Sequence, residues 1–196
     1  MAKRAAPEVN AGSMADIAFL LLIFFLVTTT IDVDSGINRK LPPMEDENVT
    51  PPKIKEKNLF TVLVNGKDQI MVEEELMELK DIRQAAIDFL DNNADGSCEY
   101  CKGKKDESSS DNPDKAIVSL KNDRETTYKT YIAVQNELVA AYNVLRDRRA
   151  QALYGNSFRE MEANLNDVNW PGDKDKLKEQ VEKIKEDYPQ KLSEVQ

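Results

Sequence analysis

Asp16 is the one charged residue within residues 9–31, a segment otherwise built from apolar and small uncharged residues. A carboxylate held away from water can change between a neutral and an ionised form near neutral pH, so it can carry a proton. Because the chain has no histidine and nothing else in the segment titrates, Asp16 is its sole candidate proton carrier. Ser13 and Asn10 precede it by three and six residues, where they would line the proton path or pack against a neighbouring helix.

A structural role for Asp16 is the main alternative. Its carboxylate could instead accept the free amide hydrogens of a helix that begins at Ile17. The apolar run at residues 17–27 also has the length of the hydrophobic part of a cleaved signal peptide. Glu8 and Asp16 are acidic where a signal peptide is basic, and the threonines at 28–30 make a poor cleavage site. We therefore interpret the segment as a membrane anchor.

A weak calcium-site signal lies in a polar stretch farther along the chain. Asp91, Asn93 and Asp95 have the spacing of the first half of an EF-hand calcium loop. The twelfth position of such a loop needs a glutamate and is Lys102 here. We therefore favour a turn and expect no metal.

Cys98 and Cys101 are the two cysteines of the chain. In an oxidising compartment they could form a local disulfide, and otherwise they are bystander thiols. One CxxC pair supplies only two of the four ligands of a zinc site. The chain also lacks a glycine-rich phosphate loop, a GxSxG elbow and an HExxH motif, so we expect no enzyme.

The elements that position these residues follow from apolar periodicity and charge. As a helix, residues 9–31 would be roughly 34 Å long, enough to cross a membrane. Lys3 and Arg4 place residues 1–8 in the cytoplasm by the positive-inside rule, so the rest of the chain lies beyond the membrane, which is the periplasm in a Gram-negative cell. The formal net charge of -9 arises after the span, which argues against nucleic acid as a partner.

The fold class expected after this transmembrane helix is α+β. A linker at residues 32–58 contains two Pro-Pro pairs, which favour extended backbone. A small ββαβα domain at 59–154 follows, with strands at 59–64, 69–72 and 116–120, helices at 78–90 and 126–154, and a polar surface insertion at 91–115. A C-terminal extension at 155–196 has an amphipathic helix at 173–187 and a short strand at 191–196. We interpret Arg146, Arg148 and Arg149 as the solvated end of the long helix.

A set of short motifs surrounds Asp16. They are Glu-Val-Asn at 8–10, the apolar run at 17–27, Asp-Val-Asp at 32–34 and Arg-Lys-Leu-Pro at 39–42. With one span, a proline-containing linker and a small α+β domain, this arrangement resembles the ExbD/TolR family of bacterial inner-membrane motor subunits. The resemblance is carried mainly by residues 7–90.

The resemblance implies that two copies of the chain sit inside a ring of a polytopic partner of the ExbB/TolQ type. Protons would load and unload Asp16 as the coupling ion, with no other cofactor. The motion would reach a TonB-like or TolA-like protein that spans the periplasm. By the same resemblance, Arg39, Leu41 and Pro42 belong to a partner-binding part of the linker.

Several functions fit these expectations. The first is a motor subunit, driven by the proton motive force, that powers a TonB-like protein for outer-membrane transport. The others are a TolR-like subunit for envelope maintenance, a single-pass scaffold that binds peptidoglycan and has no titrating role for Asp16, and a secreted binding module with a cleaved leader. Replacing Asp16 with asparagine, which cannot titrate, distinguishes the two motor functions from the scaffold.

Overall fold

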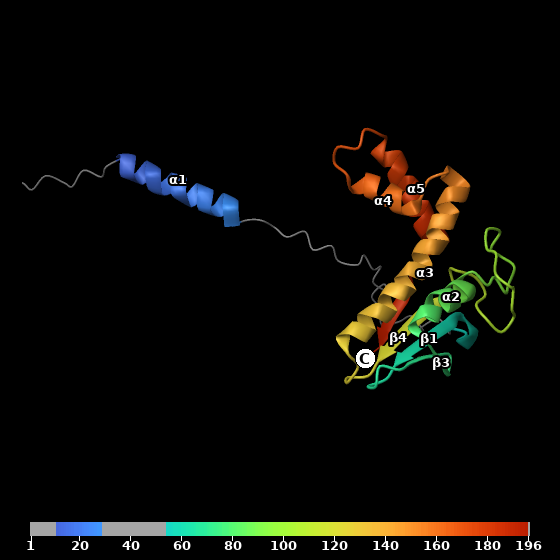
Figure 1. The fold of residues 1–196 in the computed structure, drawn as a ribbon. Helices are drawn as coiled ribbons and strands as arrows, with labels where there is room; N and C mark the ends of the chain where they lie inside the picture. The colour runs from blue at the N-terminus through green and yellow to red at the C-terminus, as the bar shows by residue number, and fades with distance from the viewer. Residues whose placement is uncertain (1–10, 29–53, 196) are drawn as a thin grey trace, which may run out of the picture. The chain divides into compact units, whose positions relative to one another are not determined.

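The computed structural model describes residues 11–28 and 54–195, and the chain divides into two units, Met1–Asn38 and Arg39–Gln196 (Figure 1). The first unit contains helix α1 (Ala11–Thr28). The predicted span at 9–31 extends beyond α1 at both ends, into positions outside the described residues. Across 11–28 and 54–195, no helix combines the length and the apolar character that crossing a membrane requires.

The second unit is built on a mixed β-sheet, entered through a short 3-10 helix, η1 (Glu56–Asn58). Its strands within the described residues are β1 (Leu59–Val64), β2 (Ile70–Val72), β3 (Glu75–Met77), β4 (Ile117–Asn122) and β5 (Leu192–Val195). Their order across the sheet is β3-β2-β1-β4-β5. β2 runs antiparallel to β1 and β3, whereas β4 runs parallel to β1 and to β5.

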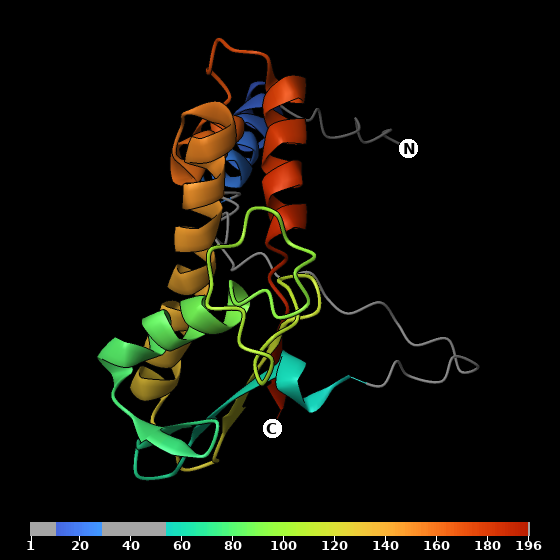
Figure 2. The same ribbon diagram turned by 90° about the vertical axis from the view of Figure 1, so that its right-hand side faces the viewer.

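Two helices, α2 (Leu79–Leu90) and α3 (Tyr128–Tyr154), share the main core with the sheet (Figures 1 and 2). Because side chains alternate along a strand, every second residue of β1 is buried against these helices. The Thr127 hydroxyl caps α3 by accepting a hydrogen bond from the Thr130 amide. Gly155, with φ of 73°, ends the helix in the left-handed conformation that glycine adopts readily.

Two further helices, α4 (Phe158–Asn166) and α5 (Lys174–Asp187), pack against the part of α3 that lies away from the sheet (Figure 1). They form a second core with α3. Its buried residues are Ala150, Phe158, Met161, Leu177, Val181 and Ile184. α5 then leads into β5, so the chain returns to the sheet after this excursion.

The α+β class predicted from the sequence is confirmed, and the order of elements is richer than ββαβα. The predicted strands and helices of the folded unit lie within a few residues of their expected bounds. β3 and α4 were not predicted. The insertion at 91–115 carries no helix or strand, and hydrogen bonds made by its buried asparagine and aspartate side chains hold it in place.

Candidate functional site

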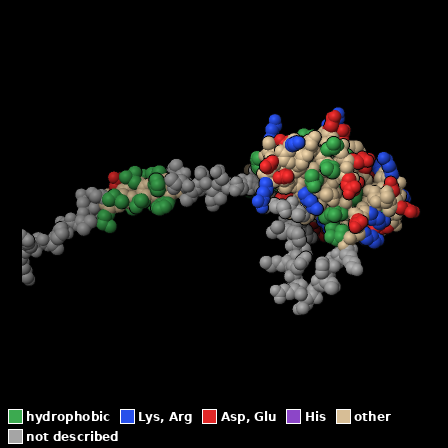
Figure 3. Space-filling view, turned by 90° about the horizontal axis from the view of Figure 1, so that it is seen from below, with side chains coloured by type: hydrophobic (Ala, Val, Ile, Leu, Met, Phe, Trp, Pro, Cys, Tyr) green, Lys and Arg blue, Asp and Glu red, His purple; other side chains and the backbone are tan. Residues whose placement is uncertain are grey.

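Asp16 is exposed in α1, and so are the large apolar side chains around it. Phe19 and Leu20, three and four residues later, are 61% and 58% exposed and lie on the same helix face as Asp16. In Figure 3 most of the visible surface of α1 is hydrophobic. A single carboxylate on such a helix needs a polar partner or a wet cavity once the apolar surface is covered.

Of the other residues predicted to act in or near the span, one lies within the described part of the chain and four lie outside it. Ser13 belongs to α1 and precedes Asp16 by three residues. Asn10 lies outside the described residues, as do the linker residues Arg39, Leu41 and Pro42. Their predicted roles therefore stay predictions.

The end of the linker is anchored by Asp111, whose side chain is 3% exposed. Its carboxylate accepts from Lys57 Nζ at 2.5 Å, and from Lys55 Nζ and Asn58 Nδ2 at 3.2 Å each. The Asp111 amide donates to Asn58 Oδ1 at 2.7 Å. The Lys57 ammonium, with help from Asn58 and Lys55, outweighs burial and lowers the pKa of Asp111 to about 2.

The three calcium candidates do not share a site. Asp91, Asn93 and Asp95 each use their side-chain oxygens on a different protein partner. Those partners are Arg148, the backbone of Cys98, and Lys115. The Lys115 ammonium, together with Ser97, holds the pKa of Asp95 well below its usual range. Within residues 11–28 and 54–195, no cluster of acidic, cysteine or histidine side chains could hold a metal ion.

Cys98 and Cys101 are joined by a disulfide, with their Cα atoms 5.5 Å apart. Tyr100 lies between them, and its ring sits 4.2 Å from the Arg149 guanidinium carbon. The Tyr100 hydroxyl donates to the Asp187 carbonyl at 2.7 Å. Burial, followed by the negative charge of Asp187, raises the pKa of Tyr100 to about 12, so its hydroxyl stays a hydrogen-bond donor at neutral pH.

The prediction that the arginines of α3 form a solvated helix end is wrong. Arg146 is 7% exposed, and its Nε donates to the Tyr188 carbonyl at 2.9 Å. Arg148 binds both oxygens of the buried Asp91, at 2.6 and 2.9 Å. The Tyr188 hydroxyl donates to Asp91 at 2.8 Å and accepts from Arg148. Desolvation would leave these charges very costly if they were not paired.

Sequence reasoning missed Asp111, Tyr100 and Tyr188. Their partners are 40 to 97 residues away along the chain, so no local pattern joins them. The only hint was the density of aspartate and asparagine in the insertion, a composition that equally suits a solvated loop.

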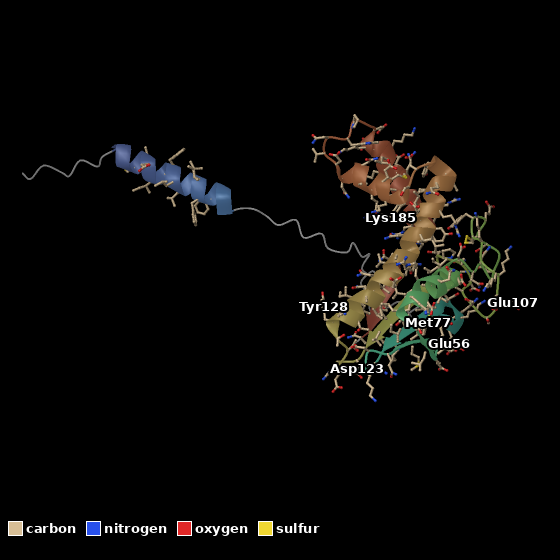
Figure 4. All side chains as sticks on the ribbon, viewed as in Figure 1. Glu56, Met77, Glu107, Asp123, Tyr128 and Lys185 are labelled. Atoms are coloured by element: carbon tan, nitrogen blue, oxygen red, sulfur yellow. A yellow bond between two sulfur atoms is a disulfide. The ribbon has the colours of Figure 1, made fainter. Side chains whose placement is uncertain are left out.

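A groove of about 510 Å³ lies beside the edge strand β3. It is lined by Met77, which Figure 4 labels, by other apolar residues of β2, β3 and α2, and by Lys129 and Thr130 of α3. None of the site residues predicted from the sequence lines it.

One comparison with known proteins gives a match. The sequence model of a family described as biopolymer transport protein ExbD/TolR matches residues 2–146, which include Asp16, the linker and most of α3. No curated protein matches the chain closely enough to count as a relative.

Proposed function

The chain belongs to the ExbD/TolR family of biopolymer transport proteins, and from that premise we propose that it is the single-pass subunit of an inner-membrane motor driven by the proton motive force. Residues 9–31 anchor it, residues 1–8 lie in the cytoplasm, and the folded unit lies in the periplasm. The motor powers a TonB-like protein for transport across the outer membrane. No covalent chemistry is assigned to the chain, and protons are the coupling ion.

One observation carries this proposal: Asp16 is the sole charged residue of a helix whose described large apolar side chains are all exposed. Such a surface needs covering by lipid or protein, and an intramembrane carboxylate is a functional candidate by default. The disulfide between Cys98 and Cys101 supports an oxidising location for the folded unit, because cytoplasmic proteins rarely keep disulfides.

The proposed cycle uses the two protonation states of Asp16. The neutral acid can pass along an apolar interface, whereas the carboxylate favours polar partners such as hydroxyl groups on a surrounding subunit. A proton entering from one side and leaving on the other therefore biases which position of the helix is preferred. Ser13, three residues before Asp16 in the sequence, lines that path or packs against a neighbouring helix in this proposal.

The proposed partners follow from the family. Two copies of the chain sit inside a ring of an ExbB/TolQ-type protein, and the linker with the folded unit engages a TonB-like or TolA-like protein, with peptidoglycan as a further candidate ligand. Purification of the full chain in mild detergent identifies the ring subunit and the periplasmic client together. A TolA-like client in place of a TonB-like one would assign the chain to envelope maintenance.

Replacing Asp16 with asparagine tests the proton-carrying role, because asparagine keeps the size and hydrogen bonding of the side chain and cannot titrate. We expect Asp16→Asn to abolish transport driven by the proton motive force while the chain still co-purifies with its ring partner. Asp16→Glu should retain measurable transport. Asp81→Asn, an exposed change in α2, is the matched control and should leave transport unchanged.

Transport that persists in Asp16→Asn cells at normal protein level would overturn the motor proposal and leave Asp16 a structural residue. Loss of transport together with loss of the ring partner would show an assembly role for Asp16 and would equally contradict a purely proton-carrying one.

A further inference from the structure

The insertion at 91–115 contacts two parts of the chain that are far apart in sequence, the end of the linker and the entry to β5. At its far end, Asp111 binds Lys55, Lys57 and Asn58 directly before β1. Lys57 also donates to the carbonyl of Glu107, which Figure 4 shows at the outer edge of the insertion. The first turn of the folded unit is therefore fastened to the insertion.

The other contact reaches the junction between α5 and β5. The Tyr100 ring packs edge-on against the Tyr188 ring at a centroid distance of 5.3 Å, and the Tyr100 hydroxyl binds the Asp187 carbonyl. Lys191, one residue before β5, binds the Asp114 carboxylate at 2.9 Å. Figure 2 shows the insertion in front of the end of α5.

Two buried asparagines connect these two contacts inside the insertion. The Asn93 side chain holds the amide and the carbonyl of Cys98, at 2.9 and 2.8 Å. The neighbouring Asn92 donates to the carbonyls of Asp106 and Ser110, at 2.8 and 2.9 Å. Both side chains are nearly fully buried, so every one of these bonds is costly to break.

The disulfide is placed at the end of this network that holds Tyr100. It closes a small loop, so its effect on the unfolded chain is modest and its main effect is to fix the backbone on either side of Tyr100. Without the disulfide, the loop has more conformational entropy. The contacts of Tyr100 with Tyr188, Arg149 and Asp187 would then be all that holds Tyr100 in place.

We propose that residues 91–115 form a redox-sensitive brace, in which the Cys98–Cys101 disulfide holds the end of the linker and the entry to β5 together. Cys98 is buried and Cys101 is partly exposed, so a dithiol reductant reaches the Cys101 sulfur. Its thiolate attacks that sulfur, the disulfide bond breaks, and Cys98 leaves as a thiolate that takes up a proton. The second thiol of the reductant then releases Cys101 and forms the reductant's own disulfide. Two electrons pass to the protein, and the brace loosens at both ends.

Hydrogen–deuterium exchange of the full chain in mild detergent, with and without dithiothreitol, tests this proposal. On reduction we expect amide exchange to quicken at least about tenfold both at Asn58 and Asp111 and at Asp187 and Tyr188, because the hydrogen bonds that protect these amides open locally. Exchange at the hairpin turn at 65–69, which the insertion does not contact through any described hydrogen bond, should not change. The readout is backbone exchange, so its outcome is independent of transport and of the proposed function.

Three variants separate the contributions of the brace. Cys98→Ser with Cys101→Ser should reproduce the reduced pattern and no longer respond to dithiothreitol. Tyr100→Phe keeps the ring and loses the hydrogen bond to the Asp187 carbonyl, so it should quicken exchange at the Asp187 and Tyr188 amides and leave the Asn58 and Asp111 amides protected. Glu99→Gln, an exposed change within the same small loop, is the matched control and should behave as the parent chain does.

Two results would overturn the brace. In one, reduction changes exchange only within residues 98–101, so the disulfide affects neither the end of the linker nor the entry to β5. In the other, protection is lost evenly over the folded unit, including the hairpin turn, so the disulfide supports the whole fold and joins no particular pair of segments.

Discussion

Asp111 is a carboxylate that the fold keeps ionised while almost completely buried. The Lys57 ammonium holds its pKa at about 2, whereas the ordinary value in an unfolded chain is about 3.9. A carboxyl group with a lowered folded-state pKa stabilises the fold in its ionised form. That contribution is complete above about pH 4 and is lost as the pH falls towards 2, because the unfolded chain takes up the proton first.

Asp111→Asn should therefore lower the midpoint of thermal unfolding by several degrees at pH 7. The difference from the parent chain should shrink below about pH 4 and be mostly lost at about pH 2, where half of the Asp111 side chains are protonated in the folded state. Thermal melts followed by circular dichroism over a series of pH values measure this. Glu107→Gln, an exposed carboxylate of the same insertion, is the control. A difference that persists undiminished at pH 2 would contradict the electrostatic explanation.

Arg148 neutralises Asp91, whose side chain is 5% exposed. Arg148→Met keeps the aliphatic stem and leaves the carboxylate with the Tyr188 hydroxyl and a backbone amide. We expect a loss of roughly 2–3 kcal/mol in the free energy of unfolding, measured by urea denaturation. Arg159→Met, an exposed change in α4, should cost much less. Equal losses in the two variants would show that the ion pair with Asp91 does not account for the contribution of Arg148 to stability.

The candidate site was predictable only where its signal is local. Asp16 stands out because its neighbours in sequence are apolar, and those neighbours alone decide the cost of a charge there. Asp111 and Arg148 gave no such signal, because the identity of a charged partner depends on the tertiary fold. Arg148 and Asp91 are 57 residues apart, and sequence proximity instead grouped Arg148 with other arginines as a solvated surface.

Among the elements, the helices in which apolar residues recur at helical spacing over several turns were predictable, and the shortest elements were not. α2, α3 and α5 repeat apolar residues over three turns or more, and their predicted bounds differ from the structure by at most two residues. β3 has three residues and follows two glutamates in left-handed conformation, a turn that sequence patterns favour for glycine or asparagine. In α4 the spacing of Phe158 and Met161 was a usable signal, with Ser157 before it as a start residue.

The second core predicts that α4 and α5 depend on one small set of apolar contacts. Ile184 is fully buried within it, so Ile184→Ala should lower the free energy of unfolding by roughly 2–5 kcal/mol. Val168 is 86% exposed in the loop before α5, and Val168→Ala should have little effect. Urea denaturation compares the two variants. In Ile184→Ala, amide hydrogen exchange should become faster first within α4 and α5. If it became faster first in β1, the two cores would not be separate.

At the scale of the whole molecule, the sheet is completed by the last residues that the structure describes. The family match ends at residue 146, yet β5 and Tyr188 come after two further helices. β5 pairs in parallel with β4. Tyr188 accepts hydrogen bonds from Arg146 and Arg148 and donates one to Asp91. The extension therefore contributes Tyr188 and Leu192 to the main core, which consists mostly of residues from the family-matched region.

A chain truncated after Tyr154 tests this dependence. It keeps every residue that the family model matches, but it exposes the β4 edge, removes the fully buried Tyr188 ring and leaves Arg146 without its carbonyl partner. Since an unpaired buried charge and an open strand edge are both costly, we expect no cooperative thermal transition and a strong tendency to aggregate. A chain truncated after Tyr188 lacks residues 189–196, which include Lys191 and β5, and should unfold cooperatively at a lower temperature. If the shorter chain melts cooperatively at the temperature of the full chain, the extension is an appendage and the matched region folds alone.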